Sequence, residues 1–255
     1  MYDVPPASAP PRHRRWRLIS LALTVAALLV APPAIAGAAT GSATLAGATT
    51  ASGDWSQAPA TLPTPWTDQV SPTNALPEYP RPQLARKSWQ SLNGLWQFAG
   101  ASAGEAPPVG ADLAEQILVP YPTESSLSGI KRHEDYMFYR RTVQVPRSWN
   151  VDKGQRLMLN FGAVDYKATV WVNGTKVGER TGGYGAFSVD ATDALKGTGP
   201  QEIIVGVEDR ADATWQPVGK QRRMPDRGIF YTAPPVSGRA CGWSRLRRRT
   251  SPGST

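Results

Sequence analysis

The 255-residue sequence is poor in thiol and imidazole side chains, with one cysteine and two histidines. Because Cys241 is the only cysteine, no intrachain disulfide can form, and the core must hold the fold together. One histidine, His13, lies near the N-terminus, and the other, His133, stands in the charged run 132–135. A single histidine with loose acids does not make a metal site, so we expect His133 to lie in a solvated loop. The sequence predicts neither a metal nor an organic cofactor.

Sequence patterns of nucleophilic catalysis are missing as well. No Gly-x-Ser-x-Gly motif is present, and neither histidine is placed to activate Ser125 or Ser126. Glu124, which precedes these serines, belongs to no pattern of paired carboxylates that the sequence alone can identify. We therefore predict that these 255 residues contain no catalytic residue.

The basic charge of the chain is concentrated at its two ends. The formal net charge is +8, from 28 Lys and Arg against 20 Asp and Glu. Residues 1–36 have an excess of three positive charges and residues 239–255 an excess of five, which leaves residues 37–238 neutral. A neutral body has no field that attracts a phosphate backbone. The charge distribution therefore predicts no nucleic-acid partner.

A long hydrophobic run is also missing. The apolar run at 18–30 is short for the ~20 residues that cross a bilayer, and two prolines follow it. It is preceded by the basic run 12–17 and followed by the small-x-small sequence Ala34-Ile35-Ala36. These parts, in this order, predict a cleaved signal peptide at 1–36 and a secreted product, in preference to a stable membrane anchor.

Residues 37–75 have no apolar period and are rich in Ala, Thr, Ser, Gly and Pro. This composition predicts a disordered lead-in. Its only aromatic residues are Trp55 and Trp66, and an isolated tryptophan in such a segment more often docks it onto a domain than binds a ligand.

From Trp89 onward, short runs of alternating polarity are separated by turn residues, and no helical period of 3.6 residues is clear. Asn173-Gly174 is the strongest hairpin signal, because both central residues of a type I′ turn need a positive φ. This pattern predicts an all-β sandwich. The expected strands are 94–98, 139–145, 156–161, 167–172, 175–179 and 202–207.

Several phrases between about residues 76 and 232 then resemble the N-terminal sugar-binding domain of family 2 glycoside hydrolases, the group of β-galactosidases, β-glucuronidases and β-mannosidases. The most specific is Phe161-Gly-Ala-Val-Asp-Tyr-Lys-Ala-Thr-Val-Trp-Val-Asn-Gly174. The others, in the order and spacing of the family, are Pro80–Leu84, Trp89–Phe98, Val119–Gly129, Phe138–Arg141, Gly182–Tyr184, Gln216–Gln221 and Gly228–Tyr231.

The resemblance implies a jelly-roll, galactose-binding-like sandwich over residues 76–238. In the family this domain precedes an immunoglobulin-like domain and a (β/α)₈ barrel, which holds the two catalytic glutamates. A barrel needs upwards of ~200 residues, for which 255 residues leave no room. We therefore expect a fragment of an exported glycosidase that is inactive alone and whose partner is a carbohydrate, a β-glycoside. A stand-alone carbohydrate-binding module and a basic-tailed interaction protein remain as alternatives.

The resemblance also implies a substrate-binding role for Asp209, because family members often have an aspartate there that contacts sugar hydroxyls. A carboxylate suits this role, since it accepts hydrogen bonds from two hydroxyls. The alternative is a turn aspartate beside Arg210 and Asp212. Trp215 and Tyr184 are candidates for stacking on a sugar ring. The remaining aromatic residues, including Trp171 and Trp96, are at least as well explained by packing.

The C-terminal segment departs from the family, whose last strand reads Ser-Gly-Ile/Met-Trp followed by Leu-Glu-Pro. Here Ser237-Gly238 is followed by the arginine-rich run 239–255, without a clear strand alternation. If residues 239–245 are encoded by CGG GCA TGT GGC TGG AGC CGG, reading two bases later gives Gly-Met-Trp-Leu-Glu-Pro. We hypothesise a frameshift near Gly238, and we expect an aberrant basic tail at 239–255 and a poorly stable sandwich that lacks its last strand.

Overall fold

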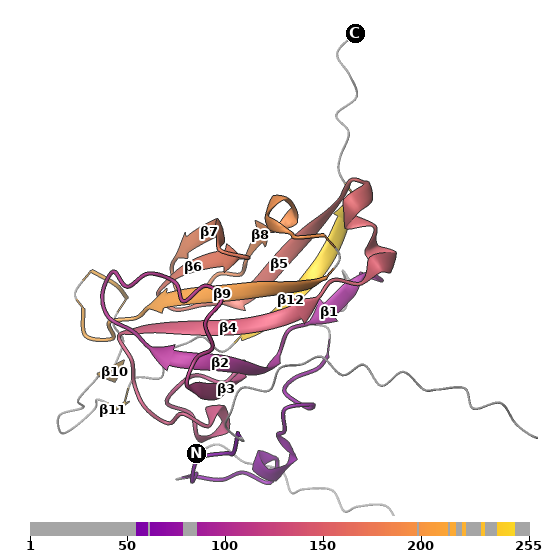
Figure 1. Ribbon diagram of the computed structural model, residues 1–255. Helices are drawn as coiled ribbons and strands as arrows, with labels where there is room; N and C mark the ends of the chain where they lie inside the picture. The colour runs from indigo at the N-terminus through magenta and orange to yellow at the C-terminus, as the bar shows by residue number, and fades with distance from the viewer. Residues whose placement is uncertain are drawn as a thin grey trace, which may run out of the picture. The chain divides into compact units, whose positions relative to one another are not determined.

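A computed structural model of the chain describes residues 55–60, 62–78, 86–197, 199–213 and 215–217, and the backbone of the strand residues 221–222, 231–232 and 239–247 (Figure 1). The signal peptide predicted at 1–36 lies outside these residues. In the described part of the chain, no helix is long and apolar enough to cross a membrane. Its helices are single 3₁₀ turns: η1 (Thr67–Gln69), η3 (Ser126–Ser128), η4 (Arg147–Trp149), η5 (Val151–Lys153) and η6 (Thr192–Ala194).

The larger sheet has six antiparallel strands in the order β3-β2-β4-β9-β6-β7. The strands are β2 (Gly94–Gly100), β3 (Glu115–Val119), β4 (Tyr136–Gln144), β6 (Lys167–Val172), β7 (Thr175–Thr181) and β9 (Pro200–Glu208). All of them except β3 were expected from the sequence.

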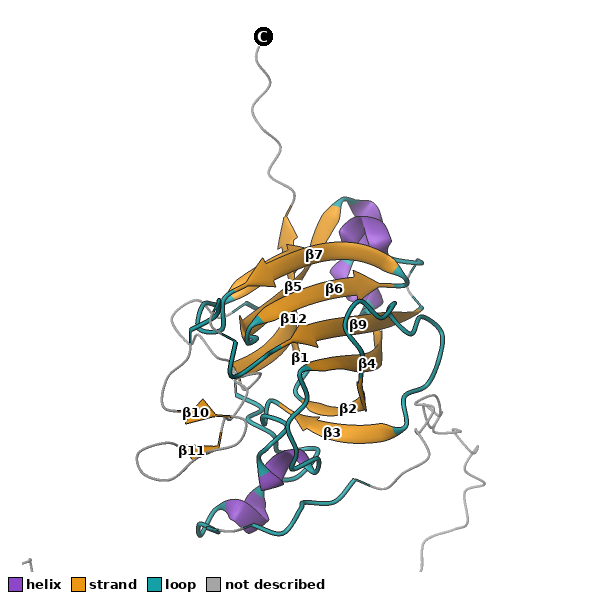
Figure 2. Cartoon of the chain, turned by 90° about the vertical axis from the view of Figure 1, so that its left-hand side faces the viewer, coloured by secondary structure: helices purple, strands orange, loops and turns teal. Residues whose placement is uncertain are grey.

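The smaller sheet has the order β1-β12-β5-β8 and forms a second layer against the larger one (Figures 1 and 2). Its strands are β1 (Trp89–Ser91), β5 (Gln155–Ala163), β8 (Phe187–Asp190) and β12 (Arg239–Arg247). Two short parallel strands, β10 (Gln221–Arg222) and β11 (Tyr231–Thr232), form a separate pair.

The inward side chains of the two sheets make one apolar core. Along β5, Leu157, Leu159 and Phe161 are buried while the residues between them are only partly buried, which is the period of two that a strand imposes. From the larger sheet, Phe98 is fully buried and packs edge-on against Tyr139, with ring centroids 5.3 Å apart. The predicted all-β sandwich is confirmed.

The hairpin predicted at Asn173-Gly174 is confirmed, with φ values of 50° and 85°. The amide of Asn173 also has a tertiary role. Its Nδ2 donates to the carbonyl oxygen of Ala194 at 2.8 Å and to Oε1 of the buried Gln201 at 2.7 Å. The turn between β6 and β7 is thereby tied to the start of β9.

The disordered lead-in predicted at 37–75 is wrong for the residues that the structure describes. The indole Nε1 of Trp55 donates to the carbonyl oxygen of Ser128 at 2.8 Å, and Ala75 is buried. Trp66, by contrast, is 68% exposed. The segment docks mainly through backbone and polar side-chain groups, which leave no apolar period in the sequence.

The prediction of a missing last strand is also wrong. Residues 239–247 form β12, which pairs with β5 from Arg239 opposite Ala163 to Arg247 opposite Gln155 and lies between β5 and β1. The ladder needs only backbone N–H and C=O groups, which each of these residues supplies. The sequence of β12 shows no clear alternation of apolar and polar residues, because a charged residue, Arg245, pairs with the buried Leu157 of β5. The frameshift stays a hypothesis, which reading the coding DNA tests.

Candidate functional site

At one end of the larger sheet, four strands share a row of paired residues. Glu208, the last residue of β9, pairs with Tyr136 at the start of β4 and with Lys167 at the start of β6. Lys167 pairs in turn with Thr181 at the end of β7. Residues just beyond this row are therefore neighbours in space, although they lie far apart in the chain.

Backbone hydrogen bonds continue beyond this row. The amide of Asp209 donates to the carbonyl oxygen of Asp135 at 2.9 Å, and that of Tyr166 donates to Glu208 at 3.1 Å. The amide of Gly182 donates to Tyr166 at 2.7 Å. The residues gathered here form the Asp209 corner, defined as Asp135, Asp165, Tyr166, Asp209, Trp215 and Gln216.

Asp209 itself is almost completely buried, with 4% of its surface exposed. Its Oδ1 accepts a 2.8 Å hydrogen bond from Nε2 of Gln216. Burial raises the pKa of Asp209, and the Gln216 hydrogen bond partly opposes that effect. Gln155 Oε1 is the only fully buried side-chain polar atom without a partner in the described part of the chain. Oδ2 of Asp209 accepts no hydrogen bond from the described residues, so Gln216 is the side chain that holds this carboxylate.

Asp165 supplies a second carboxyl to the corner. It lies two residues before the start of β6, and the peptide bond between Asp165 and Tyr166 is cis. Burial, and then the charge of Asp209, raise the pKa of Asp165 to about 6. Gly183 packs closely against it, since a Cβ at position 183 would lie 2.2 Å from Oδ1 of Asp165. The corner thus combines two carboxyls whose ionisation is mutually unfavourable.

The predicted aromatic residues are placed differently. Trp215 lies in the corner, 49% exposed, with its ring centroid 5.4 Å from that of Tyr166. Tyr184 is 67% exposed and follows Gly183 on the neighbouring turn. Trp171 packs edge-on against Phe138 at 6.4 Å, in agreement with the packing interpretation.

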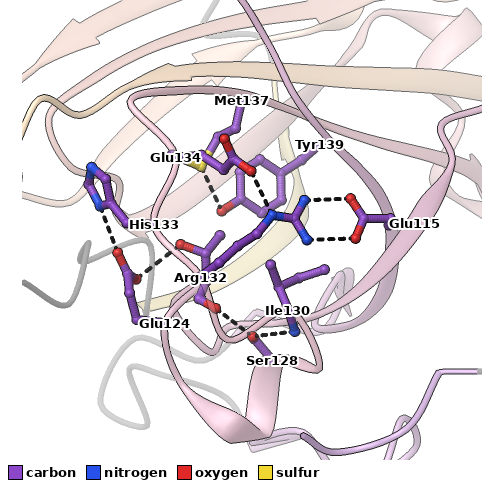
Figure 3. Close-up of polar contacts among 10 residues, drawn as sticks. Glu115, Glu124, Ser128, Ile130, Arg132, His133, Glu134, Met137 and Tyr139 are labelled. Carbon is purple, nitrogen blue, oxygen red and sulfur yellow. Dashed lines mark hydrogen bonds and ion pairs between the residues drawn. The ribbon is translucent and has the colours of Figure 1, made fainter.

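The segment between β3 and β4, residues 120–135, leads into Asp135 of the corner, and Figure 3 shows several of its polar contacts. We call it the 120–135 connection. Within it, Oγ of Ser128 donates to the carbonyl oxygen of Thr123 at 3.0 Å. Arg132 reaches back to β3, where two of its nitrogens contact the carboxylate of Glu115 at 2.5 and 2.7 Å, and its Nε donates to Glu134 at 2.6 Å. These contacts fix the path of the chain toward Asp135.

The prediction that His133 lies in a solvated loop is wrong. Its side chain is 12% exposed and lies between Glu124 and Asp135, with Nδ1 2.8 Å from Oε1 of Glu124 and Nε2 3.0 Å from Oδ1 of Asp135 (Figure 3 draws the Glu124 contact). The Glu124 contact raises the pKa of His133, and burial raises the pKa of Glu124. Glu124 meets the histidine because the 120–135 connection folds back on itself, whereas Asp135 is only two residues away in the chain.

Chemically, the corner offers carboxylate acceptors next to an exposed indole ring. Carboxylates accept hydrogen bonds from hydroxyls, and an indole face packs against the apolar face of a sugar. Asp209 is buried and one of its oxygens is engaged by Gln216, which suits an acceptor rather than a nucleophile. No group of three or more His, Cys, Asp or Glu side chains that could hold a metal occurs among the described residues.

Comparison with known families gives a match over residues 109–237, just over half of the chain, to the glycosyl hydrolase 2 galactose-binding domain-like family. The chain belongs to glycosyl hydrolase family 2. The matched range includes β4 to β9 and all six residues of the Asp209 corner.

Similar proteins include a β-glucuronidase of Canis lupus familiaris, 33% identical over 48% of this chain and 20% of the relative. A β-glucuronidase of Paenibacillus borealis is 32% identical over 58% of this chain and 25% of the relative. A β-galactosidase of Arthrobacter sp. (strain B7) is 33% identical over 42% of this chain and 11% of the relative. The chain thus spans a quarter or less of the length of these curated relatives.

Among solved structures, the chain is similar to the β-glucuronidase of Bifidobacterium dentium complexed with coumarin-3-O-glucuronide. The TM-score is 0.48 at 23% identity, over 63% of this chain and 30% of that chain.

Sequence reasoning named Asp209 and Trp215 as candidates, and both lie in the corner, but it did not name the other members. Asp165, Tyr166 and Gln216 lie inside the phrases that carry the family resemblance, yet nothing in those phrases tells a binding residue from a packing residue. One usable signal was position, because Asp165 lies two residues before the predicted strand 167–172 and Asp209 lies two residues after the predicted strand 202–207. No sequence signal links Glu124 to His133.

Proposed function

We propose that this chain is the N-terminal sugar-binding domain of an exported family 2 glycoside hydrolase, and that its Asp209 corner contacts the hydroxyls of a β-glycoside. The observation that carries this proposal is the setting of Asp209, a buried carboxylate whose Oδ1 is held by Gln216, the residue that follows the exposed Trp215. Asp209 would accept hydrogen bonds from the sugar, and Trp215 and Tyr184 would pack against its ring. The relatives named β-glucuronidase and β-galactosidase support a β-glycoside as the ligand.

We further propose that these 255 residues do not hydrolyse glycosides by themselves. A retaining glycosidase needs two carboxyls ~5–5.5 Å apart on either side of the scissile bond. In the corner, the buried Asp209 is committed to Gln216. The chain spans only a quarter or less of its β-glucuronidase relatives, which is consistent with a catalytic domain located elsewhere.

Export is proposed from residues 1–36. Expression in a secreting bacterial host should give a mature protein that begins at Gly37, without stable membrane association. N-terminal sequencing of the secreted product tests this, and an uncleaved, membrane-bound product would contradict it. We propose no nucleic-acid partner, because the charge excess lies at the two ends.

Backbone NMR titration of the 255-residue chain with methyl β-glycosides, including the glucuronide and the galactoside, tests the binding role. We expect weak binding, with shifts at the amide of Asp209 and the indole of Trp215, and loss of these shifts in Asp209→Asn. Asp193→Asn is the matched control, because Asp193 is exposed and precedes β9, whereas Asp209 follows it. Shifts that avoid the corner, or that persist in Asp209→Asn, would contradict the role.

A dissociation constant in the micromolar range for the isolated chain would instead favour the stand-alone carbohydrate-binding module. A domain that completes its site with a barrel is expected to bind its sugar only weakly when alone, because it contributes few of the contacts.

A further inference from the structure

His133 is unusual in that both of its ring nitrogens face a carboxylate oxygen. Nδ1 lies 2.8 Å from Oε1 of Glu124, and Nε2 lies 3.0 Å from Oδ1 of Asp135. The side chains of His133 and Glu124 are 12% and 11% exposed, and that of Asp135 is 27% exposed. Glu124 is held in place in turn by Oγ1 of Thr123, which donates to its Oε2 at 3.0 Å.

Counting protons shows what this arrangement requires. A neutral imidazole has one N–H, so its other nitrogen presents a lone pair. Opposite an ionised carboxylate, that lone pair would repel the oxygen at hydrogen-bond distance. Both contacts are attractive only while Glu124, His133 and Asp135 hold one proton beyond the neutral ring, as an imidazolium or as a protonated carboxyl. In either form the three groups carry a net charge of about −1.

The surrounding charges favour keeping this proton. The Glu124 contact raises the pKa of His133, and the Asp135 contact acts in the same direction. The negative charge of Asp209 also interacts favourably with the ring. Arg132, which precedes His133 in the chain, is directed at Glu115 and Glu134 and does not replace the ring proton.

Asp135 connects this cluster to the Asp209 corner, because its carbonyl oxygen accepts the amide of Asp209. Glu124 lies eleven positions before Asp135 in the same connection, so the ring joins the two ends of that loop. Of the charged groups on β9 and the loop that follows it, Asp209 and Glu208 border Asp135, and Glu208 accepts a hydrogen bond from Tyr136 at 3.3 Å.

We infer that His133 is a positioning residue for the Asp209 corner: its doubly hydrogen-bonded ring fixes Asp135 and, through the Asp135 carbonyl, the Asp209 carboxylate that contacts the sugar. Loss of the shared proton at alkaline pH would release the 120–135 connection and loosen the corner. The effect on sugar binding rests on the proposed function. The His133 clasp, defined as the contacts of the His133 ring with Glu124 and Asp135, can be measured without any sugar.

The chain allows an unusually direct test, because it has only two histidines. In a His13→Gln chain labelled with ¹⁵N-histidine, His133 gives the only imidazole signals. We expect both ring nitrogens to be hydrogen-bonded at neutral pH, and the ring to titrate above the ordinary histidine value as the pH rises from about 5 to about 10. Glu124→Gln should lower that midpoint. A ring with one bare nitrogen at neutral pH, or a midpoint that Glu124→Gln leaves unchanged, would overturn the inference.

Hydrogen exchange at the amide of Asp209 reports the positioning role. We expect its protection to fall about tenfold in His133→Gln, which keeps a polar side chain but contacts one carboxylate at most. The amide of Asn173, which donates to the carbonyl oxygen of Glu202 near the other end of β9, is the internal control for intact folding and should keep its protection. Unchanged protection of Asp209 with a titrating ring would show that His133 positions nothing. If the titration and exchange results are as expected but no methyl glycoside changes the NMR signals of the corner, the proposed function is contradicted while the positioning role of His133 is supported.

Discussion

The side-chain amide of Gln216 joins two consecutive residues: its Nε2 donates to Oδ1 of Asp209 at 2.8 Å, and its Oε1 accepts the amide of Arg210 at 3.3 Å. One side chain therefore closes the loop after β9 and holds a buried carboxylate. A carboxylate kept in such a place lowers stability when it is ionised. That cost is explained if the residue is retained for contact with a ligand.

The second carboxyl of the corner, Asp165, should make the stability of the chain depend on pH. Asp165 has a pKa of about 6 in the folded chain, above its value of about 3.8 when exposed, so the folded state binds more protons between these limits. Its contribution therefore favours folding at low pH, and stability is lost as the pH rises from about 4 to about 6. Asp165→Asn should remove this loss and raise stability at neutral pH. Urea unfolding on both sides of the window measures it, with Asp193→Asn as control. Equal pH dependence of Asp165→Asn and the parent chain would contradict the assignment.

Arg140, on the outer face of β4, holds three side chains at once. Its Nε donates to Oε1 of Glu202 at 2.7 Å, and NH1 donates to Gln97 and Asp112 at 2.7 and 2.6 Å. Arg140→Ala leaves Glu202, 14% exposed, without this cation, which should lower the free energy of unfolding by about 2–3 kcal/mol. Arg140→Lys should recover only part of this, since an ammonium group cannot reproduce the fork. A decrease of less than about 0.5 kcal/mol in the free energy of unfolding, measured with denaturant, would show that the Arg140 network contributes no more than an exposed ion pair.

Gly129 marks the place where the N-terminal segment docks. Its φ is 88°, and a Cβ at this position would lie 2.6 Å from Nε1 of Trp55. Gly129→Ala should therefore displace Trp55 and expose residues 55–60 to proteases. Gly104→Ala is the matched control, because Gly104 also has a positive φ, 75°, but has no atom within 4 Å of its added Cβ. Limited proteolysis should separate the two variants, and equal cleavage rates would contradict docking through Trp55.

Strand β12 joins β1 to β5, so its removal should be severe. A chain that ends at Gly238 would expose the edges of both strands, and we expect it to aggregate. A chain that ends at Arg247 keeps the whole strand and serves as the control. Size-exclusion chromatography and thermal melting compare the two. A monomeric, cooperatively melting chain ending at Gly238 would show that β12 does not stabilise the sandwich.

The elements that were predicted correctly are those in which local pattern and tertiary role agree. Along β5, the apolar residues Leu157, Leu159 and Phe161 of the sequence pattern are also the buried ones. Asn173-Gly174 favours the tight turn that the structure shows, because both residues adopt a positive φ. Strands β1 and β8 have three and four residues, too few to show a period. Strand β12 was missed because arginines interrupt its apolar pattern, while backbone pairing does not depend on side chains.

The candidate site was less predictable for a different reason. Asp209 was found through the family resemblance, but its neighbours Asp135 and Asp165 reach it through strand register between segments far apart in the chain. The His133 clasp likewise depends on a loop that folds back on itself. Such proximity is a property of the folded sheet and has no counterpart in composition or spacing.

The central claim is that these 255 residues form a sugar-binding domain that does not cleave glycosides alone. Incubating the purified chain with 4-methylumbelliferyl β-glucuronide and β-galactoside, and measuring fluorophore release, tests it most directly. The account predicts no release above the buffer blank for the parent chain. Release that disappears in Asp209→Asn or Asp165→Asn but persists in Asp193→Asn would contradict it, because the corner would then be a catalytic site.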